Sequence, residues 1–249
     1  MRALTLLGVS CAVSLSLGLA PQDANCDAIG DVQFICGIIS PEDLAVVPGE
    51  EWIIASGDQE GGRIHLVNVR DKTTTLLFPT SAPAERLDVV TYPTCPGPID
   101  PQEGDEFRAH GLYLTAGSNG AHRLYVVHHG FRESIEVFEV DTRSTLPTLT
   151  WIGCAVAPEA LGFNSVVALP GGGLVATSPR TGDVWEWQTG AGWPRVPGSE
   201  DTTPHGVEVS RTMVVGVTNH TSCATSHLAR RPLSAPPRLG MGAYGGVGL

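Results

Sequence analysis

The fold is decided by residues 107–140, which read FRAHGLYLTAGSNGAHRLYVVHHGFRESIEVFEV. This segment predicts three β-strands, over 107–115, 123–130 and 134–140, separated by the turn-forming stretches 117–120 and 130–134. Apolar residues alternate along the third strand, and 124–127 is a continuous apolar run, as expected of a strand buried on both faces. Short strands joined in this way predict an antiparallel meander.

Two histidines mark the ends of this meander. His110 lies at the start of its first strand and His129 at the end of its second. Because antiparallel pairing brings the start of one strand beside the end of the next, both histidines are expected at one edge of the sheet. This edge is a candidate functional site, although a histidine can equally be an ordinary strand residue bonded to a neighbouring loop.

The same pattern of short strands recurs along the chain. Residues 43–78 predict four strands, residues 107–156 four more when 149–156 is included, and residues 164–198 a third unit. Residues 80–105 predict a Pro-rich connection, and a fourth unit begins at 205 without continuing. Repeats of four short strands predict an all-β fold, a β-propeller of four-stranded antiparallel blades, with about three blades plus one strand over 21–210.

Each repeat opens with a polar residue followed by apolar alternation. These residues are Glu42, His110, Asn164 and His205. In a propeller the innermost strand of each blade starts at the central channel, so the four side chains are expected to converge at one end of the axis.

Composition limits the partners. The chain of 249 residues carries 26 acidic and 15 basic residues, a formal charge of -11. This excess of negative charge argues against a nucleic-acid partner and favours a cation. No phosphate loop, dinucleotide-binding glycine pattern or Gly-x-Ser-x-Gly turn occurs in the sequence.

Residues 1–20 have the features of a secretory signal peptide, with a membrane anchor as the weaker alternative because no flanking charges follow. Export would place the later cysteines in an oxidising compartment. We expect Cys26 to pair with Cys36 and Cys95 with Cys154, which leaves Cys223 spare; buried free thiols are the alternative.

Residues 211–249 contain no Asp or Glu, unlike the acid-rich sequence before them. The change falls directly after HGVEVS, in the middle of a predicted unit. We therefore predict a disordered tail that follows a change of reading frame or a truncation of the gene. His220, Cys223 and His227 in this tail have loosely metal-like spacing but offer only three ligands.

Four strings together resemble one family: PEDLAVVPGEEWIIASG, the HGLYL and YVVHHG pair, ESIEVFEVD, and FNSVVALPGGGLVAT. They resemble the calcium-dependent six-bladed propeller hydrolases, the group of paraoxonase/arylesterase, gluconolactonase and strictosidine-synthase-like proteins. The resemblance covers roughly residues 36–210.

The resemblance implies a set of site residues. Glu42 and Asn164 match ligands of a central calcium ion, and His110 and His129 match a catalytic histidine dyad. Asp43 and the main-chain carbonyl of Leu112 match part of a second, structural calcium site. His205 stands where the family has an asparagine ligand, and Ser165 and His128 also depart from the family pattern.

Three functions follow as alternatives. The first is an exported calcium-dependent hydrolase of small-molecule esters or lactones, in which calcium polarises the carbonyl and His110 accepts a proton from water. The second is a non-catalytic binding propeller, favoured by the histidine at 205. The third is an inactive fragment, because an incomplete array leaves blade faces uncovered.

Overall fold

The computed structural model describes residues 26–100, 106–209, 213–218 and 230–232. The chain falls into two units, residues 1–36 and 37–249. In the first, Ile29 and Val32 exchange main-chain hydrogen bonds of 3.0 and 3.1 Å, and a disulfide joins Cys26 to Cys36. The predicted pairing of these two cysteines is confirmed. The predicted signal peptide lies outside the described residues.

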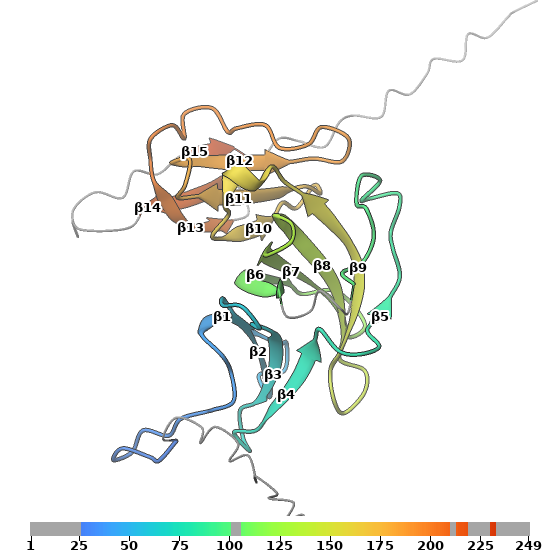
Figure 1. Cartoon of the computed structure of the whole chain (residues 1–249), viewed down its shortest axis with the longest axis vertical. Helices are drawn as coiled ribbons and strands as arrows, with labels where there is room; N and C mark the ends of the chain where they lie inside the picture. Colours follow the sequence, from blue (N-terminus) through green and yellow to red (C-terminus); the bar gives the residue numbers. More distant parts are fainter. Residues whose placement is uncertain (1–25, 101–105, 210–212, 219–229, 233–249) are drawn as a thin grey trace, which may run out of the picture. The chain divides into compact units, whose positions relative to one another are not determined.

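The second unit is built from β-sheets, as predicted (Figure 1). The described residues include a short 3-10 turn, Glu159–Leu161, and no helix among them is long and apolar enough to cross a bilayer. Three of the four sheets connect consecutive strands as antiparallel meanders. The remaining sheet is such a meander with one parallel strand added at its edge. The predicted all-β class is therefore confirmed.

The first sheet contains the four strands predicted over residues 43–78. They are β1 (Pro41–Val46), β2 (Trp52–Gly57), β3 (Ile64–Asn68) and β4 (Thr74–Phe78), paired in that order. The hairpin between β1 and β2 turns at Gly49 and Glu50, which both have positive φ angles. Glycine adopts this conformation without the steric cost that a side chain brings, which explains the Pro-Gly break in the sequence.

The second sheet contains the predicted meander. Its strands are β6 (Arg108–Thr115), β7 (Ala121–His129), β8 (Ser134–Asp141) and β9 (Thr148–Val156), with β5 (Ala84–Glu85) at the edge. The short β5 was not predicted. It pairs in parallel with β9, where Ala84 and Glu85 lie opposite Thr150 and Trp151. A two-residue strand has no alternation of its own to reveal it.

The third and fourth sheets have three strands each. They are β10 (Val166–Ala168), β11 (Leu174–Ser178) and β12 (Asp183–Trp187), and then β13 (Pro204–Val209), β14 (Met213–Thr218) and β15 (Arg230–Pro232).

The expectation that strand pairing ends near residue 210 is wrong. Strand β14 pairs with β13, where Val214–Val217 lie opposite Gly206–Val209, and β15 pairs with β14. The β-branched residues Val214, Val215 and Val217 favour a strand, even though the acidic residues end before this segment. The rest of the predicted disordered tail lies outside the described residues.

One hydrophobic core joins the first three sheets. Phe78 of β4 makes edge-to-face contacts with Phe107 and Phe138, with ring centroids 5.1 and 5.0 Å apart. Trp187 of the third sheet stacks on Tyr92, in the connection before the second sheet, at 5.6 Å. Aromatic contacts of this kind add to the free energy of burial and fix neighbouring sheets against one another.

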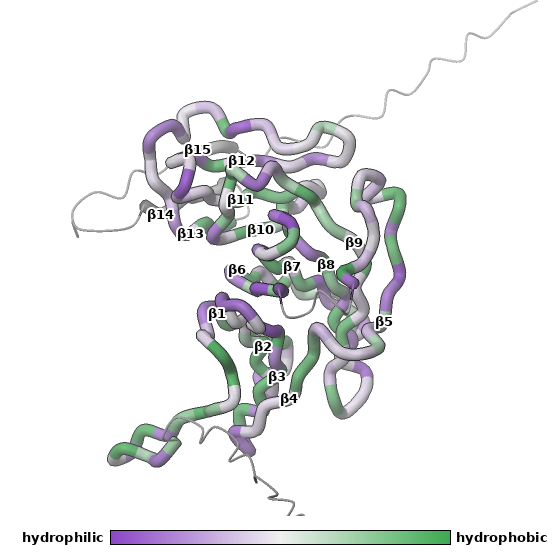
Figure 2. The backbone as a smooth tube through the Cα atoms, in the orientation of Figure 1, coloured by the Kyte–Doolittle hydropathy of each residue, from purple (hydrophilic) through white to green (hydrophobic). Residues whose placement is uncertain are grey.

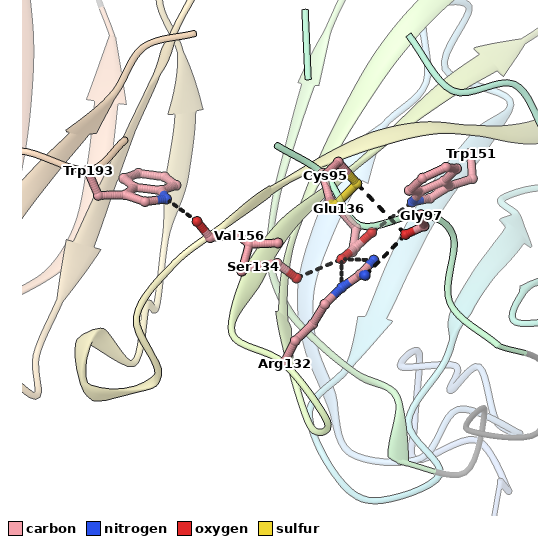
Figure 3. The surroundings of a disulfide bond; sticks show 9 residues. Cys95, Gly97, Arg132, Ser134, Glu136, Trp151, Val156 and Trp193 are labelled. Carbon is pink, nitrogen blue, oxygen red and sulfur yellow. Dashed lines mark hydrogen bonds and ion pairs between the residues drawn. A yellow bond between two sulfur atoms is a disulfide. The ribbon is translucent and has the colours of Figure 1, made fainter. Parts of the chain in front are cut away.

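A disulfide fastens the Pro-rich connection to the second sheet. Cys95 bonds to Cys154 on β9, which confirms the second predicted pairing (Figure 3). Close by, Arg132 donates from its Nη1 to the carbonyl of Gly97 at 3.1 Å. The connection is thus held by a covalent bond and by polar contacts, which include the N–H of Asp88 donating to the carbonyl of Ile152 at 2.9 Å.

The same region contains a fully buried carboxylate. Glu136 accepts hydrogen bonds from Arg132 Nε at 2.8 Å, Ser134 Oγ at 2.6 Å and Trp151 Nε1 at 2.7 Å (Figure 3). Burial raises the pKa of Glu136, and the guanidinium of Arg132 acts in the opposite direction. A buried charge is tolerated in a protein when it is paired and hydrogen-bonded in this way.

His128 is buried as a neutral imidazole. Its ring stacks on Phe107 at 4.7 Å and contacts Phe131 at 4.9 Å, and its Nδ1–H donates to the carbonyl of Arg108 at 3.2 Å. Burial, the largest cause, lowers the pKa of His128 from 6.5 to about 3. This apolar packing explains why a histidine is accommodated before His129.

This buried histidine predicts a loss of stability in mild acid. The unfolded chain takes up the proton below pH 6.5, whereas folded His128 resists protonation down to about pH 3. The free energy of unfolding should therefore fall by about 2 kcal/mol between pH 7 and pH 5 from this group. Urea titrations across this range would measure it. In His128→Asn, the pH dependence should be flatter by that amount; an unchanged pH dependence would contradict the assignment.

Candidate active site

The two predicted histidines lie in direct contact. His110 is on β6 and His129 ends β7, and His110 Nδ1 is 3.0 Å from His129 Nε2. Arg108 pairs with His129 across the two strands, and the register is irregular between Ala109 and Leu112. That irregularity contains His110. Both side chains are largely buried, each 15% exposed.

Glu133 fixes the proton on His129. Its carboxylate oxygen Oε2 lies 2.8 Å from His129 Nδ1, and its Oε1 accepts from the main-chain N–H of Phe163 at 2.7 Å. The carboxylate is 5% exposed. Because an ionised carboxylate only accepts, Nδ1 of His129 carries the hydrogen and its Nε2 is left as an acceptor. His129 Nε2 then accepts from His110 Nδ1–H.

The other ring nitrogen of His110 faces two further predicted residues. Asn164, which precedes β10, places its side-chain amide nitrogen 2.9 Å from His110 Nε2. Glu42 of β1 places Oε1 3.3 Å from the same nitrogen. Figure 2 shows hydrophilic segments at β1 and β6, the strands that contain Glu42 and His110. The structure therefore brings Glu42, His110, His129 and Asn164 together around one imidazole.

The site forms where the first strands of successive sheets meet. Strand β6 contacts β1 on one side and β10 on the other (Figure 1). Glu42 and His110 lie near the starts of β1 and β6, and Asn164 lies two residues before β10. Residues about 60 apart in sequence therefore share a site because equivalent positions of neighbouring sheets adjoin.

Asp58 was not among the predicted site residues. It follows β2, and its Oδ2 is 3.6 Å from His110 Nδ1. Its other oxygen, Oδ1, accepts from Arg108 Nη2 at 2.9 Å. The guanidinium of Arg108 offsets the negative charge and fixes the orientation of the carboxylate.

Asn164 is held in place by its main chain. Its N–H donates to the carbonyl of Thr177 at 2.9 Å, while the N–H of Thr177 donates to the carbonyl of Ser165 at 3.0 Å. Across the sheet boundary, Gly111 lies so close to the carbonyl of Asn164 that a side chain has no room there. This glycine therefore permits β6 to approach the segment that carries Asn164.

The close approach predicts the effect of Gly111→Ala. A Cβ atom at Gly111 would meet the carbonyl of Asn164 and lie 3.0 Å from Cα of Ser165, so the two segments must separate. Overpacking of this kind costs roughly 1–3 kcal/mol of unfolding free energy. Chemical denaturation measures the loss. Gly171→Ala, which adds a methyl group where nothing lies within 4 Å, is the control, and equal effects of the two changes would refute the close approach.

The other predicted ligands, Asp43, Leu112 and His205, form hydrogen bonds between side chains and the main chain. Asp43 Oδ2 accepts from the N–H of Leu112 at 2.8 Å, and its Oδ1 accepts from the N–H of Leu44 at 2.8 Å. This contact uses the N–H of Leu112; its carbonyl as a calcium ligand, which the resemblance implies, stays a prediction. The carbonyl of His205, in β13, accepts from Thr177 Oγ1 at 2.9 Å.

The comparisons with known proteins give a distant similarity of fold and no match in sequence. No family model matches the chain, and no curated protein matches its sequence. Among solved structures, it is similar to a Bacteroides uniformis protein assigned as a 6-phosphogluconolactonase, at 10% identity and a TM-score of 0.41. The aligned region covers 78% of this chain and 57% of that protein.

Fold and site together define an all-β protein with a carboxylate–histidine–histidine chain at the junction of its sheets.

Proposed function

We propose that the protein is an exported hydrolase of small-molecule esters or lactones, in which His110 is the general base. The observation that carries this proposal is the linear series Glu133 Oε2, His129 Nδ1, His129 Nε2, His110 Nδ1, with contacts of 2.8 and 3.0 Å. A series of this kind orients the terminal imidazole and stabilises the positive charge that it acquires, as in catalytic triads.

The tautomers follow from the anchored carboxylate. With hydrogens on Nδ1 of both rings, His110 Nε2 carries a lone pair on the side of Glu42 and Asn164. A water molecule placed there would lose its proton to His110 Nε2 while its oxygen attacks the substrate carbonyl. The new N–H of the imidazolium would face Glu42 Oε1, 3.3 Å away. Collapse then breaks the carbon–oxygen bond to the leaving group, which takes the proton from His110.

A calcium ion fits the oxygen-bearing side chains on this side of His110. Glu42 and Asn164 both approach one nitrogen, so a carboxylate and an amide lie within a few ångströms of each other. Hard cations prefer such oxygen ligands, and Glu42 and Asn164 are the residues that would hold the ion. When bound, calcium would polarise the substrate carbonyl.

The architecture and the location belong to the same proposal. Sheets of consecutive strands whose first strands adjoin support an arrangement of propeller blades. The two disulfides support export, because such bonds persist in oxidising compartments.

Turnover of phenyl acetate and of a simple lactone tests the proposal. We expect saturable hydrolysis by the purified, oxidised chain, lost on chelation of calcium and restored by adding it. Glu42→Gln, which keeps the size of the side chain and removes its charge, should require more calcium for the same rate. Hydrolysis that is indifferent to chelation would remove calcium from the mechanism. No hydrolysis, with no heat of calcium binding, would favour a non-catalytic protein instead.

A further inference from the structure

A second group of ligand atoms lies at Nδ1 of His110, whereas Glu42 and Asn164 lie at its Nε2. Asp58, His110 and His129 each offer one such atom, and the three atoms lie within 4.8 Å of one another. His110 Nδ1 is 3.0 Å from His129 Nε2 and 3.6 Å from Asp58 Oδ2. Two imidazole nitrogens and one carboxylate oxygen form a donor set for a transition-metal ion such as zinc, and a poor set for calcium.

The separations match the bond lengths of zinc. With zinc–nitrogen and zinc–oxygen bonds of about 2.0–2.1 Å, donors 3.0 and 3.6 Å apart subtend roughly 95° and 120° at the metal. These angles lie on either side of the tetrahedral value. The third pair, Asp58 and His129, lies within 4.8 Å, and these two side chains would draw closer where that separation exceeds the span of two such bonds, about 4.2 Å. The three side chains, each 15–19% exposed, are reachable from solvent.

Neighbouring residues orient two of the three ligand atoms for a metal ion. Glu133 accepts from His129 Nδ1, which leaves Nε2 as the free donor and reproduces the carboxylate–histidine–metal arrangement of zinc proteins. Arg108 holds Oδ1 of Asp58 at 2.9 Å, and Oδ2 faces His110. Two of the three donors are thus oriented by partners that do not themselves enter the site.

We propose that Asp58, His110 and His129 bind one zinc ion, and that this ion switches off the base. The ion takes the place of the hydrogen between the two imidazoles. That hydrogen moves to Nε2 of His110, which binds the ion through Nδ1 as a neutral imidazole and has no lone pair left to accept a proton. With Nδ1 bound to the metal, His110 no longer transmits charge to His129 and Glu133. The metal site stands on its own geometry, whereas its inhibitory effect rests on the proposed function.

Zinc binding to the full, oxidised chain tests the site without any substrate. We expect calorimetry to show one zinc equivalent that Asp58→Asn weakens by more than about tenfold, since losing even an outer partner of a metal ligand costs that much. The difference between the two proteins isolates this site from binding elsewhere, including at His220, Cys223 and His227. Asp71→Asn, which alters an exposed carboxylate in the turn after β3, should bind like the wild type.

The absorption spectrum of bound cobalt distinguishes loss of the metal site from loss of the fold. Cobalt should give the wild type the visible absorption of a tetrahedral nitrogen–oxygen site, and Asp58→Asn should lose it while melting as a folded protein. Equal zinc affinity in the wild type and Asp58→Asn, or no cobalt spectrum, would overturn the site.

Inhibition is measured separately from binding. Zinc at saturating concentration should lower kcat by at least about 100-fold, the lower range for losing a general base. Asp58→Asn should need at least about tenfold more zinc for the same effect. Unchanged or increased turnover with zinc bound would overturn the inhibitory role. The proposed zinc site itself would then still stand on the binding measurements. If the chain hydrolyses no ester or lactone, the proposed function fails, and the binding measurements still decide the metal site.

Discussion

Replacing His110 with glutamine should lower kcat/KM for ester or lactone hydrolysis by about 10²–10⁴-fold, the usual contribution of a general base. Glutamine can still hydrogen-bond to His129, but it cannot take a proton from water at neutral pH. The fold should remain, because His110 lies at the site rather than in the hydrophobic core. Steady-state rates with phenyl acetate, together with a thermal melt of the same sample, would measure both effects.

His122→Gln is the matched control for this change. His122 lies at the other end of β7, where its Nδ1 accepts from the N–H of Gly117 at 3.1 Å and its Nε2 lies 3.2 Å from Thr142 Oγ1. This variant should hydrolyse substrate at the wild-type rate. If His110→Gln retains more than half of the activity, His110 is not the base.

The largest effect on stability is expected for Arg132→Met. The change leaves the fully buried carboxylate of Glu136 without its cation, although Ser134 and Trp151 still donate to it. Removing one member of a buried ion pair typically costs about 3–5 kcal/mol of unfolding free energy. Urea unfolding followed by tryptophan fluorescence would measure the loss, and the double variant Arg132→Met, Glu136→Gln should recover part of it.

A surface pair provides the comparison. Arg143 binds Asp141 through two nitrogens, but both residues are open to solvent. Arg143→Met should leave the unfolding midpoint within experimental error, because water screens exposed ion pairs. A similar loss in both variants would mean that burial around Glu136 does not control the energy of its pair.

The parts of the fold that could be predicted are those with local signals. The strands from β6 to β9 alternate or run apolar between glycine-rich turns, so the sequence predicted them and the edge shared by His110 and His129. Glu42 and Asn164 could be found because each lies two residues before the apolar residues that open a predicted strand, Leu44 and Val166. The cysteine pairs Cys26–Cys36 and Cys95–Cys154 were also predicted correctly, from a choice that spacing alone does not fix.

The residues that were missed reach the site from turns. Asp58 follows β2 at the end of ASGD, and Glu133 lies in the turn GFRES between β7 and β8. Periodicity carries no information about which turn residues point inward, because that depends on the register of the hairpin and on neighbouring sheets. A signal for Glu133 was nevertheless present: a carboxylate four residues after His129, across a tight turn, is within reach of its ring.

The central claim is that Glu133 fixes His129 so that His110 Nε2 is the base. Nitrogen-15 NMR of histidine-labelled protein, freed of metal and held near pH 8, tests it directly. We predict that His129 and His110 both carry hydrogen on Nδ1 and that Nε2 of each is bare, and that Glu133→Gln disturbs this pattern. A hydrogen on Nε2 of His129 in the wild type would contradict the claim, because that ring could then no longer accept from His110.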